Sequence, residues 1–265
     1  MKSFKLTLLA MTAIFFLQGC DDDSDESTSP LPNQPDIDTE IVGTWSNDDS
    51  SNGLSTIVFI DDETYVQVQV DSSQSTSNPE NGMEWGNYNI NNSTGKLTAT
   101  PIFDKNSSSG LSDSINRRAQ VSNGKLILEV DENNDGIIDS DESYEFSKIQ
   151  PEGILGSWSF DDTDDDELIG LAFFDNGTYV HVQVDKAGSV NNPENGMEWG
   201  NYTVDPTTGR LATSMIYDDN GGNGLSEPRT HYARVTGDTA LTIEADNDQN
   251  GSIDSGESFA FSRPS

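Results

Sequence analysis

Apolar and polar residues alternate with a period of two along most of the chain after residue 40. Two segments show the pattern most clearly, and their apolar faces are formed by Val66, Val68 and Val70 and by Leu126, Leu128 and Val130. Alternation of this kind predicts β-strands, and apolar residues rarely recur at the spacing of an amphipathic helix. We therefore expect an all-β protein in which these bulky faces fill the cores.

Turn signals separate the alternating segments at short intervals. Asn-Gly pairs occur at Asn81-Gly82, Asn123-Gly124 and Asn176-Gly177, and Ser93-Thr94-Gly95 is a further turn sequence. The spacing predicts about eight short strands in each half of the chain. Short antiparallel strands joined by tight turns favour an up-and-down barrel or a sandwich.

The chain contains an internal repeat with an offset of 113 to 115 residues. The matching segments are Ile41–Trp45 with Ile154–Trp158, Thr64–Val70 with Thr178–Val184, and Asn78–Tyr88 with Asn192–Tyr202. The last pair is the identical string NPENGMEWGNY. Each copy is long enough to bury its own core. We predict one β-barrel over residues 39–149, a linker at 150–153 and a second barrel over 154–265.

Within each copy the motifs resemble those of bacterial lipocalin-like domains. The motifs are a Gly-x-Trp opening strand, F-x-x-x-x-T-Y-V at Phe59–Val66 and Phe173–Val180, a Gly-x-Tyr hairpin strand, and a closing L-x-L and F-x-F pair. The resemblance covers about residues 41–149 and 154–263. It implies two tandem antiparallel up-and-down barrels of about eight strands, and a barrel lumen that could carry a small apolar ligand.

The N-terminus has the pattern of a targeting segment. Lys2 and Lys5 precede a short apolar run, which ends in Leu17-Gln18-Gly19-Cys20. This ending resembles the bacterial lipobox, which implies a signal peptide over residues 1–19 and a lipidated Cys20. Because Cys20 is the only cysteine, lipidation would leave no thiol for a disulfide or for catalysis.

Residues 20–38 are acidic and rich in Ser and Pro, so we expect a lipid anchor followed by a disordered tether. An Asp directly after the lipidated Cys resembles an inner-membrane retention signal of enterobacteria, whereas an acidic stretch there resembles a surface-export signal of other lineages. The leaflet, inner, outer or cell surface, stays open. The formal net charge of −34 argues against a nucleic-acid partner and favours divalent cations.

Two twelve-residue segments at equivalent places in the repeat match the EF-hand calcium loop. The pattern places oxygen ligands at positions 1, 3, 5, 7, 9 and 12. In the first loop these are Asp131, Asn133, Asp135, Ile137 through its carbonyl, Asp139 and Glu142. In the second they are Asp246, Asp248, Asn250, Ser252 through its carbonyl, Asp254 and Glu257. We predict two calcium sites, with Gly136 and Gly251 making the turn at position 6.

The loops depart from a true EF-hand because they join strands, not helices. The first is flanked by the predicted strands at Lys125–Val130 and Ser143–Ile149. A static, stapling site is therefore a simpler interpretation than a calcium-triggered opening.

The identical block contains the remaining candidate site residues. Trp85 and Trp199 are expected either to pack in the core or barrel rim, or to contact a glycan or protein ligand. Glu84 and Glu198 are interpreted as solvated strand carboxylates, with an acid–base role or a second metal site as the alternatives. Asp104 with Asn106, and Asp218 with Asn220, are interpreted as turn caps.

Catalysis has little support in this sequence. Its two histidines, His181 and His231, stand where the first copy has Gln67 and Arg117, and no Ser nucleophile has a base beside it. We predict a non-catalytic, calcium-binding interaction or adhesion module, lipid-anchored in the bacterial cell envelope. The alternatives are a lipocalin-like carrier of a small apolar ligand and, third, a glycan-processing enzyme.

Lipidation can be tested by metabolic labelling with a radioactive fatty acid. The mature protein should incorporate the label, and Cys20→Ser should abolish incorporation because no other thiol precedes the tether. Mature wild-type protein that carries no label would contradict the lipobox assignment.

Overall fold

The structure, a computed structural model, describes residues 40–49, 53–61, 63–71, 74, 77–78, 80–107, 110–113, 116–131, 135–139, 142–162, 167–185, 195–221 and 224–264. The expected signal peptide, Cys20 and the tether lie outside these residues. In the described part, no helix is long and apolar enough to cross a membrane.

All regular elements in the described residues are strands, which confirms the all-β prediction. The first repeat contains β1 (Gly43–Asp49), β2 (Gly53–Phe59), β3 (Thr64–Asp71), β4 (Gly82–Asn91), β5 (Lys96–Asp104), β6 (Arg117–Ser122), β7 (Lys125–Val130) and β8 (Ser143–Lys148). The second contains β9 (Gly156–Asp162), β10 (Glu167–Phe173), β11 (Thr178–Asp185), β12 (Gly196–Val204), β13 (Arg210–Asp218), β14 (Thr230–Thr236), β15 (Ala240–Asp246) and β16 (Ser258–Ser262).

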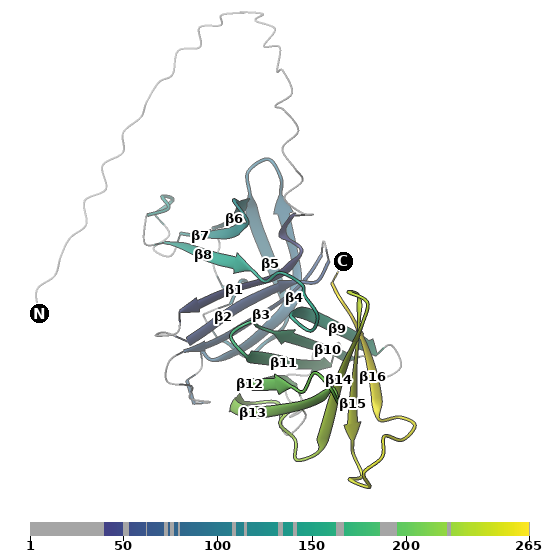
Figure 1. Cartoon of the computed structure of the whole chain (residues 1–265). Coiled ribbons are helices and arrows are strands. Elements are labelled where there is room, and N and C mark those ends of the chain that lie inside the picture. The colour runs from purple at the N-terminus through teal and green to yellow at the C-terminus, as the bar shows by residue number, and fades with distance from the viewer. Residues whose placement is uncertain are drawn as a thin grey trace, which may run out of the picture. The chain divides into compact units, whose positions relative to one another are not determined.

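Each repeat closes into an antiparallel barrel in which consecutive strands are neighbours (Figure 1). Strand β8 returns to β1 in the first barrel, and β16 returns to β9 in the second. Both barrels belong to one compact unit, Pro35–Ser265. The prediction of two tandem up-and-down barrels is confirmed.

The barrels are closed unevenly. In the first, β5 and β6 are joined only by Lys96↔Arg118 and Leu97↔Arg117, whereas β1 to β5 share long ladders. The second barrel has the same short joint between β13 and β14. Because β8 and β1, and likewise β16 and β9, are also joined by only one or two residue pairs, each closed barrel has a five-stranded part and a three-stranded part, called the five-stranded and three-stranded sheets below. The predicted calcium loop of each repeat connects the last two strands of its three-stranded sheet.

Each barrel has its own packed interior. The first is filled by Ile41, Trp45, Ile57, Phe59, Tyr65, Tyr88, Ile90, Leu97, Leu111, Ala119, Leu126, Leu128 and Phe146. The second is filled by Trp158, Leu171, Phe173, Tyr179, Leu211, Leu225, Ala233, Leu241, Ile243 and Phe261. The opening tryptophans Trp45 and Trp158 donate through Nε1 to the carbonyls of Ile41 and Ile154, and so fix the chain entering each barrel.

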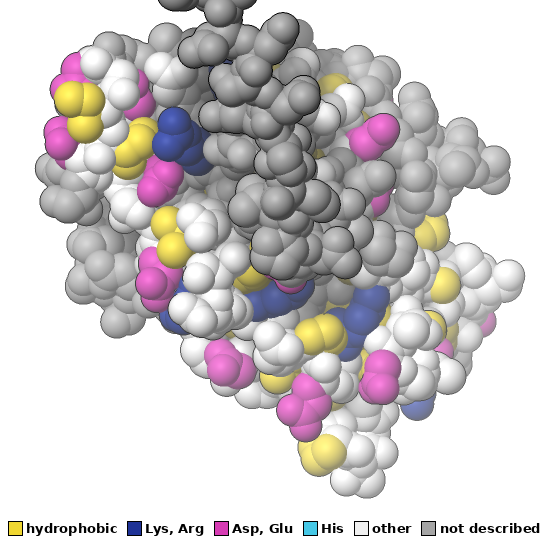
Figure 2. Space-filling model, turned by 90° about the horizontal axis from the view of Figure 1, so that it is seen from above, with side chains coloured by type: hydrophobic (Ala, Val, Ile, Leu, Met, Phe, Trp, Pro, Cys, Tyr) yellow, Lys and Arg dark blue, Asp and Glu magenta, His cyan; other side chains and the backbone are white. Residues whose placement is uncertain are grey.

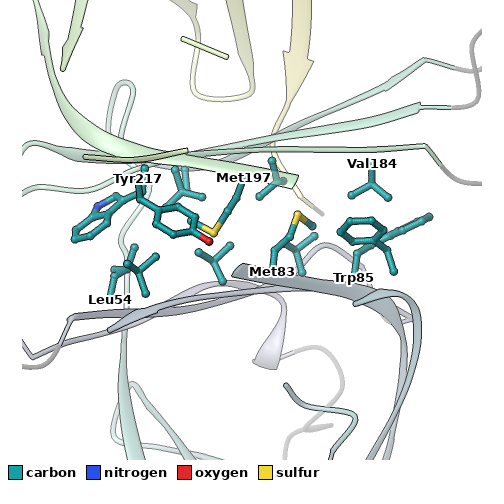
Figure 3. Close-up of a cluster of buried hydrophobic side chains, with 14 of the residues drawn as sticks. Leu54, Met83, Trp85, Val184, Met197 and Tyr217 are labelled. Atoms are coloured by element: carbon teal, nitrogen blue, oxygen red, sulfur yellow. The ribbon is translucent and has the colours of Figure 1, made fainter. Parts of the chain in front are cut away.

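A third apolar cluster lies between the two barrels (Figure 3). We call the residues that each barrel contributes its inter-barrel face. The first barrel contributes Leu54, Val66, Val68, Val70, Met83, Trp85 and Phe103, with Val58 and Ile60 packed against them. The second contributes Leu168, Ala172, Phe174, Val180, Val182, Val184, Met197, Trp199 and Tyr217.

This arrangement corrects one sequence prediction. Val66, Val68 and Val70 were expected to fill the first barrel, but they point out of it and into the inter-barrel cluster. Leu126 and Leu128 do lie in the interior. The alternation of β3 was interpreted correctly as a strand, but both faces of this strand are buried, so periodicity alone could not say which face points inward.

The identical block is explained by the contacts of its residues. Asn81 closes a turn, as expected, because its N–H donates to the Asn78 carbonyl at 3.1 Å, and its Oδ1 accepts from Asp71 N at 2.7 Å. Gly86 lies at a bulge of β4, where a Cβ would lie 2.2 Å from the Thr100 carbonyl oxygen. Tyr88 donates to the Asp61 carbonyl at 2.6 Å. The close approach of the Gly86 backbone to a neighbouring strand and the hydrogen bonds of Asn81 and Tyr88 therefore restrict which residues this block can contain.

Candidate functional site

The second predicted calcium loop connects β15 to β16 and folds around the carboxylate of Asp246. Asn250 N donates to Asp246 Oδ1 and Gly251 N donates to Asp246 Oδ2, both at 3.0 Å. Gly251 has a φ of 86°, a left-handed value that a side chain would strain. The turn expected at position 6 is therefore present.

Three carboxylates converge inside this loop. Oxygen atoms of Asp246, Asp248 and Glu257 all lie within 4.8 Å of one another. Asp246 and Glu257 are buried, and Asp248 is exposed. Like charges at this separation repel one another, so a cation among them would stabilise the loop. A donor set made only of oxygen atoms suits calcium.

The other predicted ligands of the second loop lie around the same carboxylates. Asn250 Nδ2 donates to Asp248 Oδ2 at 2.8 Å and to Asp254 Oδ2 at 2.9 Å. Asp254 N donates to Glu257 Oε2 at 2.8 Å, which ties position 9 to position 12. Ser252 is exposed, and its N–H donates to Asn250 Oδ1 at 2.8 Å. The structure therefore brings five of the six predicted positions into one hydrogen-bonded group through their side chains.

The first loop repeats this geometry in its described part. Asp135 N and Gly136 N donate to the two oxygens of Asp131 at 3.1 and 3.0 Å. Asp139 N donates to Glu142 Oε2 at 2.9 Å. Gly136 has a φ of 85°. The two loops thus share their turn and their position 9 to position 12 bond.

The loops differ in how completely the structure describes them. Asn133 lies outside the described residues, and Ile137 is 63% exposed at position 7. Among the described residues, the second loop alone forms a group of three or more side chains close enough to hold a metal ion. Calcium binding at either loop stays a prediction.

Trp85 and Trp199 lie between the barrels, in equivalent places on β4 and β12. They are 6% and 8% exposed, and neither indole Nε1 has a hydrogen-bond partner among the described residues. Both rings therefore pack among the apolar side chains of the inter-barrel cluster, which is one of the two arrangements expected from the sequence. Their contact with a glycan or protein ligand stays an untested prediction.

Glu84 and Glu198 are not solvated, contrary to the interpretation from sequence. Glu84 is fully buried and accepts from Tyr65 OH at 2.5 Å, from Ser112 N at 3.1 Å and from Ser112 Oγ. Glu198 accepts from Tyr179 OH at 2.5 Å and from Ser226. Each carboxylate thereby holds the loop after the fifth strand of its barrel against the interior.

Burial has the expected electrostatic effect on this network. It raises the pKa of Glu84, and the hydrogen bonds from Ser112 and Tyr65 oppose that shift. Burial and the Glu84 charge raise the pKa of Tyr65 far above its usual value. Gly110 leaves room for the carboxylate, since a Cβ there would lie 2.2 Å from Glu84 Oε2. Because both oxygens accept hydrogen bonds and the residue is fully buried, the Glu84 carboxylate fastens the loop that contains Ser112.

The turn caps predicted after the fifth strands are confirmed. Asn106 N donates to Asp104 Oδ1, and Asn220 N donates to Asp218 Oδ1, both at 3.0 Å. Asn106 and Asn220 are both fully buried: Asn106 lies near Glu84 beside Gly110, and Asn220 contacts His181.

The two histidines line the interior of the second barrel, and both are buried. His181 Nδ1 is 3.1 Å from Asn220 Nδ2, so the neutral ring accepts this hydrogen bond. Burial and the charge of His231 lower the pKa of His181 to about 4. Burial and the charge of Arg229 lower the pKa of His231 to about 4.

Acidic side chains are scattered over the visible surface (Figure 2). On this face they stand singly among polar and apolar neighbours, and they do not form one continuous patch. The three carboxylates that converge in the second loop are a local feature of the described residues.

Comparisons with known proteins assign no family. No family model and no curated protein matches the chain. Among solved structures, a Helicobacter pylori beta clamp bound to a DNA ligase peptide has 9% identity and a TM-score of 0.12, over 90% of this chain and 60% of the clamp chain. The same clamp in complex with 5-chloroisatin has 9% identity and a TM-score of 0.12, over 83% and 54%. The chain spans about 60% of the clamp's length, and similarity this low carries no argument about fold or function.

The buried histidines predict that acid destabilises the second barrel. Their folded-state pKa values, about 4, lie below the usual 6.5. The unfolded chain therefore binds more protons, and stability falls as pH drops from 6.5 toward 4, by on the order of 1 kcal/mol per pH unit for each histidine. His181→Gln with His231→Arg installs the residues of the first barrel and should flatten this dependence. Urea unfolding in calcium-free buffer at several pH values measures it.

The double variant is compared directly with the wild type. Both chains have the same carboxylates, so carboxylate titration affects both stability curves equally and any difference comes from the histidines. Parallel stability curves for wild type and the double variant between pH 6.5 and 5 would show that the histidines do not control acid sensitivity.

Proposed function

We propose that the protein is a calcium-binding lipoprotein of the bacterial cell envelope, anchored through Cys20, whose two barrels form a non-catalytic interaction module. One observation carries the calcium part: oxygen atoms of Asp246, Asp248 and Glu257 lie within 4.8 Å of one another in a loop with the expected turn. The repetition of the same backbone geometry around Asp131 supports a second site.

The position of the loops suggests what calcium would do. Each loop joins the last two strands of the three-stranded sheet, and that sheet is attached to the rest of the barrel by only short pairings. Asp246 ends β15, and Glu257 directly precedes β16. An ion held by both residues would clamp the two strand ends together. We propose a structural role, in which calcium stabilises the least supported edge of each barrel.

The interaction module is favoured over a ligand carrier because the interiors are filled. Trp45, Phe59 and Tyr65 occupy the first barrel, and Trp158, Phe173 and Tyr179 occupy equivalent places in the second. A cavity between the barrels, lined by residues such as Val68 and Val182, has a volume of about 30 Å³. Small-molecule sites have roughly 300 Å³ or more. A stoichiometric lipid in purified protein would instead support the carrier.

The anchor is supported by the sequence alone. The basic start, the short apolar run and the Leu17–Cys20 motif occur in the order that bacterial lipoproteins require. An anchored, strongly acidic module with filled barrels would offer its outer surface to partners, and we propose an envelope glycan or protein as the partner class.

Calcium removal tests the proposed role. A metal bound only by the folded state stabilises it by about 2.7 kcal/mol at a hundredfold excess over Kd. Melting curves with calcium and with a chelator should therefore differ by several degrees. Glu142→Gln and Glu257→Gln should each remove part of the difference, because each replaces the bidentate ligand of one loop.

Glu145→Gln is the matched control, since it makes the same charge change on the exposed side of β8, outside either loop. This variant should keep the full calcium effect. Superimposable melting curves in calcium and in chelator would refute calcium stabilisation.

A further inference from the structure

The inter-barrel faces of the two barrels are built from equivalent residues. Nine residues of the first face correspond, at a constant offset of 114, to nine of the second. The pairs are Leu54 and Leu168, Val58 and Ala172, Ile60 and Phe174, Val66 and Val180, Val68 and Val182, Val70 and Val184, Met83 and Met197, Trp85 and Trp199, and Phe103 and Tyr217. Six of the nine pairs are identical. Each barrel therefore presents the same surface to the other.

The contacts between the barrels have two-fold character. Strand β4 contacts β12, and β1 contacts β9, so each strand meets its own equivalent. In Figure 3 the side chains of Met83 and Met197 face each other near the middle of the cluster, with Trp85 opposite Val184 toward one end. An interface in which one patch meets its own copy is isologous, the kind found in symmetric homodimers.

The polar contacts at the edge use equivalent acceptors. Tyr217 OH donates to the Asn81 carbonyl oxygen at 3.1 Å, and Lys105 Nζ donates to the Asn195 carbonyl oxygen. Asn81 and Asn195 are equivalent, whereas the donors come from different positions. Each barrel therefore has one donor and one acceptor at this edge. A pair of identical barrels could form the same kind of hydrogen bond twice.

From this equivalence we infer that the inter-barrel face is a self-pairing surface, and that the partner it fits is a second copy of the same barrel. If two first barrels from separate chains paired, each would bury the six side chains that are identical in the two faces. Lys105 of each barrel would then reach the Asn81 carbonyl of the other. In the intact chain the short linker keeps the two barrels at high effective concentration, so they pair within one molecule. The inference is independent of calcium.

The inference is tested in the full mature chain, made soluble by Cys20→Ser, by disabling one face at a time. Val182→Asp with Met197→Asp places charges on the second face and frees the first. This chain should form a dimer through its first barrel, because a buried unpaired charge prevents the pairing within one chain. Val68→Asp with Met83→Asp should give a dimer through the second barrel. All four substitutions together should give a monomer, as should the parent chain, when mass is measured by light scattering.

Disulfide cross-linking detects the same pairing of two first barrels even when the dimer is too weak for light scattering. In the chain with the charged second face, Met83→Cys should form a disulfide-linked dimer, since two copies of this position would face each other. Asn87→Cys, on the same strand at an exposed position, is the control and should not cross-link. Circular dichroism checks folding, and Val182→Thr with Met197→Gln offers a milder way to weaken the face. Folded single-face variants that stay monomeric without cross-linking, or that aggregate without a defined stoichiometry, would overturn the inference.

Discussion

Burial of both faces of the same strands is the constraint on which the rest of the structure depends. On β3, Tyr65 points into the barrel, whereas Val66 and Val68 point to the other barrel. The equivalent residues of β11 do the same. A strand with no solvated face has little freedom in register, because a slip of one residue would exchange its polar and apolar sides. The two barrels therefore stabilise each other through the strands that also form their walls.

The inward face of these strands contains polar residues that hold the rest of each barrel in place. A buried carboxylate is costly unless its oxygens accept hydrogen bonds. Glu84 meets this requirement through Tyr65 of β3 and Ser112 of the loop after β5. Glu84 therefore links β3, whose outer face packs against the other barrel, to the loop that contains Ser112. The second barrel keeps the carboxylate and its Tyr179 hydrogen bond, but His181 lies opposite it on the neighbouring strand, where the first barrel has Gln67.

Much of the fold could be predicted from the sequence because it depends on local patterns. Alternation gave the strands, turn residues separated them, and the repeat gave two barrels of the same design. The direction of the strand faces could not be predicted, since Val66 and Tyr65 are both large and apolar enough to be buried. The burial of Glu84 was missed for a related reason: its partner Ser112 is 28 residues away, and no local signal marks a contact at that distance. The duplicated block around Glu84 and Glu198 was the available sign, because an identical string of eleven residues implies constraints stronger than those of a solvated hairpin.

Oxidative footprinting of the methionines tests most directly whether the barrels pack through these faces. Met83 and Met197 are fully buried in the inter-barrel cluster, whereas Met215 of β13 is 50% exposed and serves as an internal standard. Hydroxyl radicals should oxidise Met215 rapidly in the folded protein and leave Met83 and Met197 protected, as measured by mass spectrometry of the peptides. Oxidation of Met83 and Met197 at the rate of Met215, in protein that keeps its β-sheet spectrum, would show that the two faces are open to solvent and would contradict the packing described above.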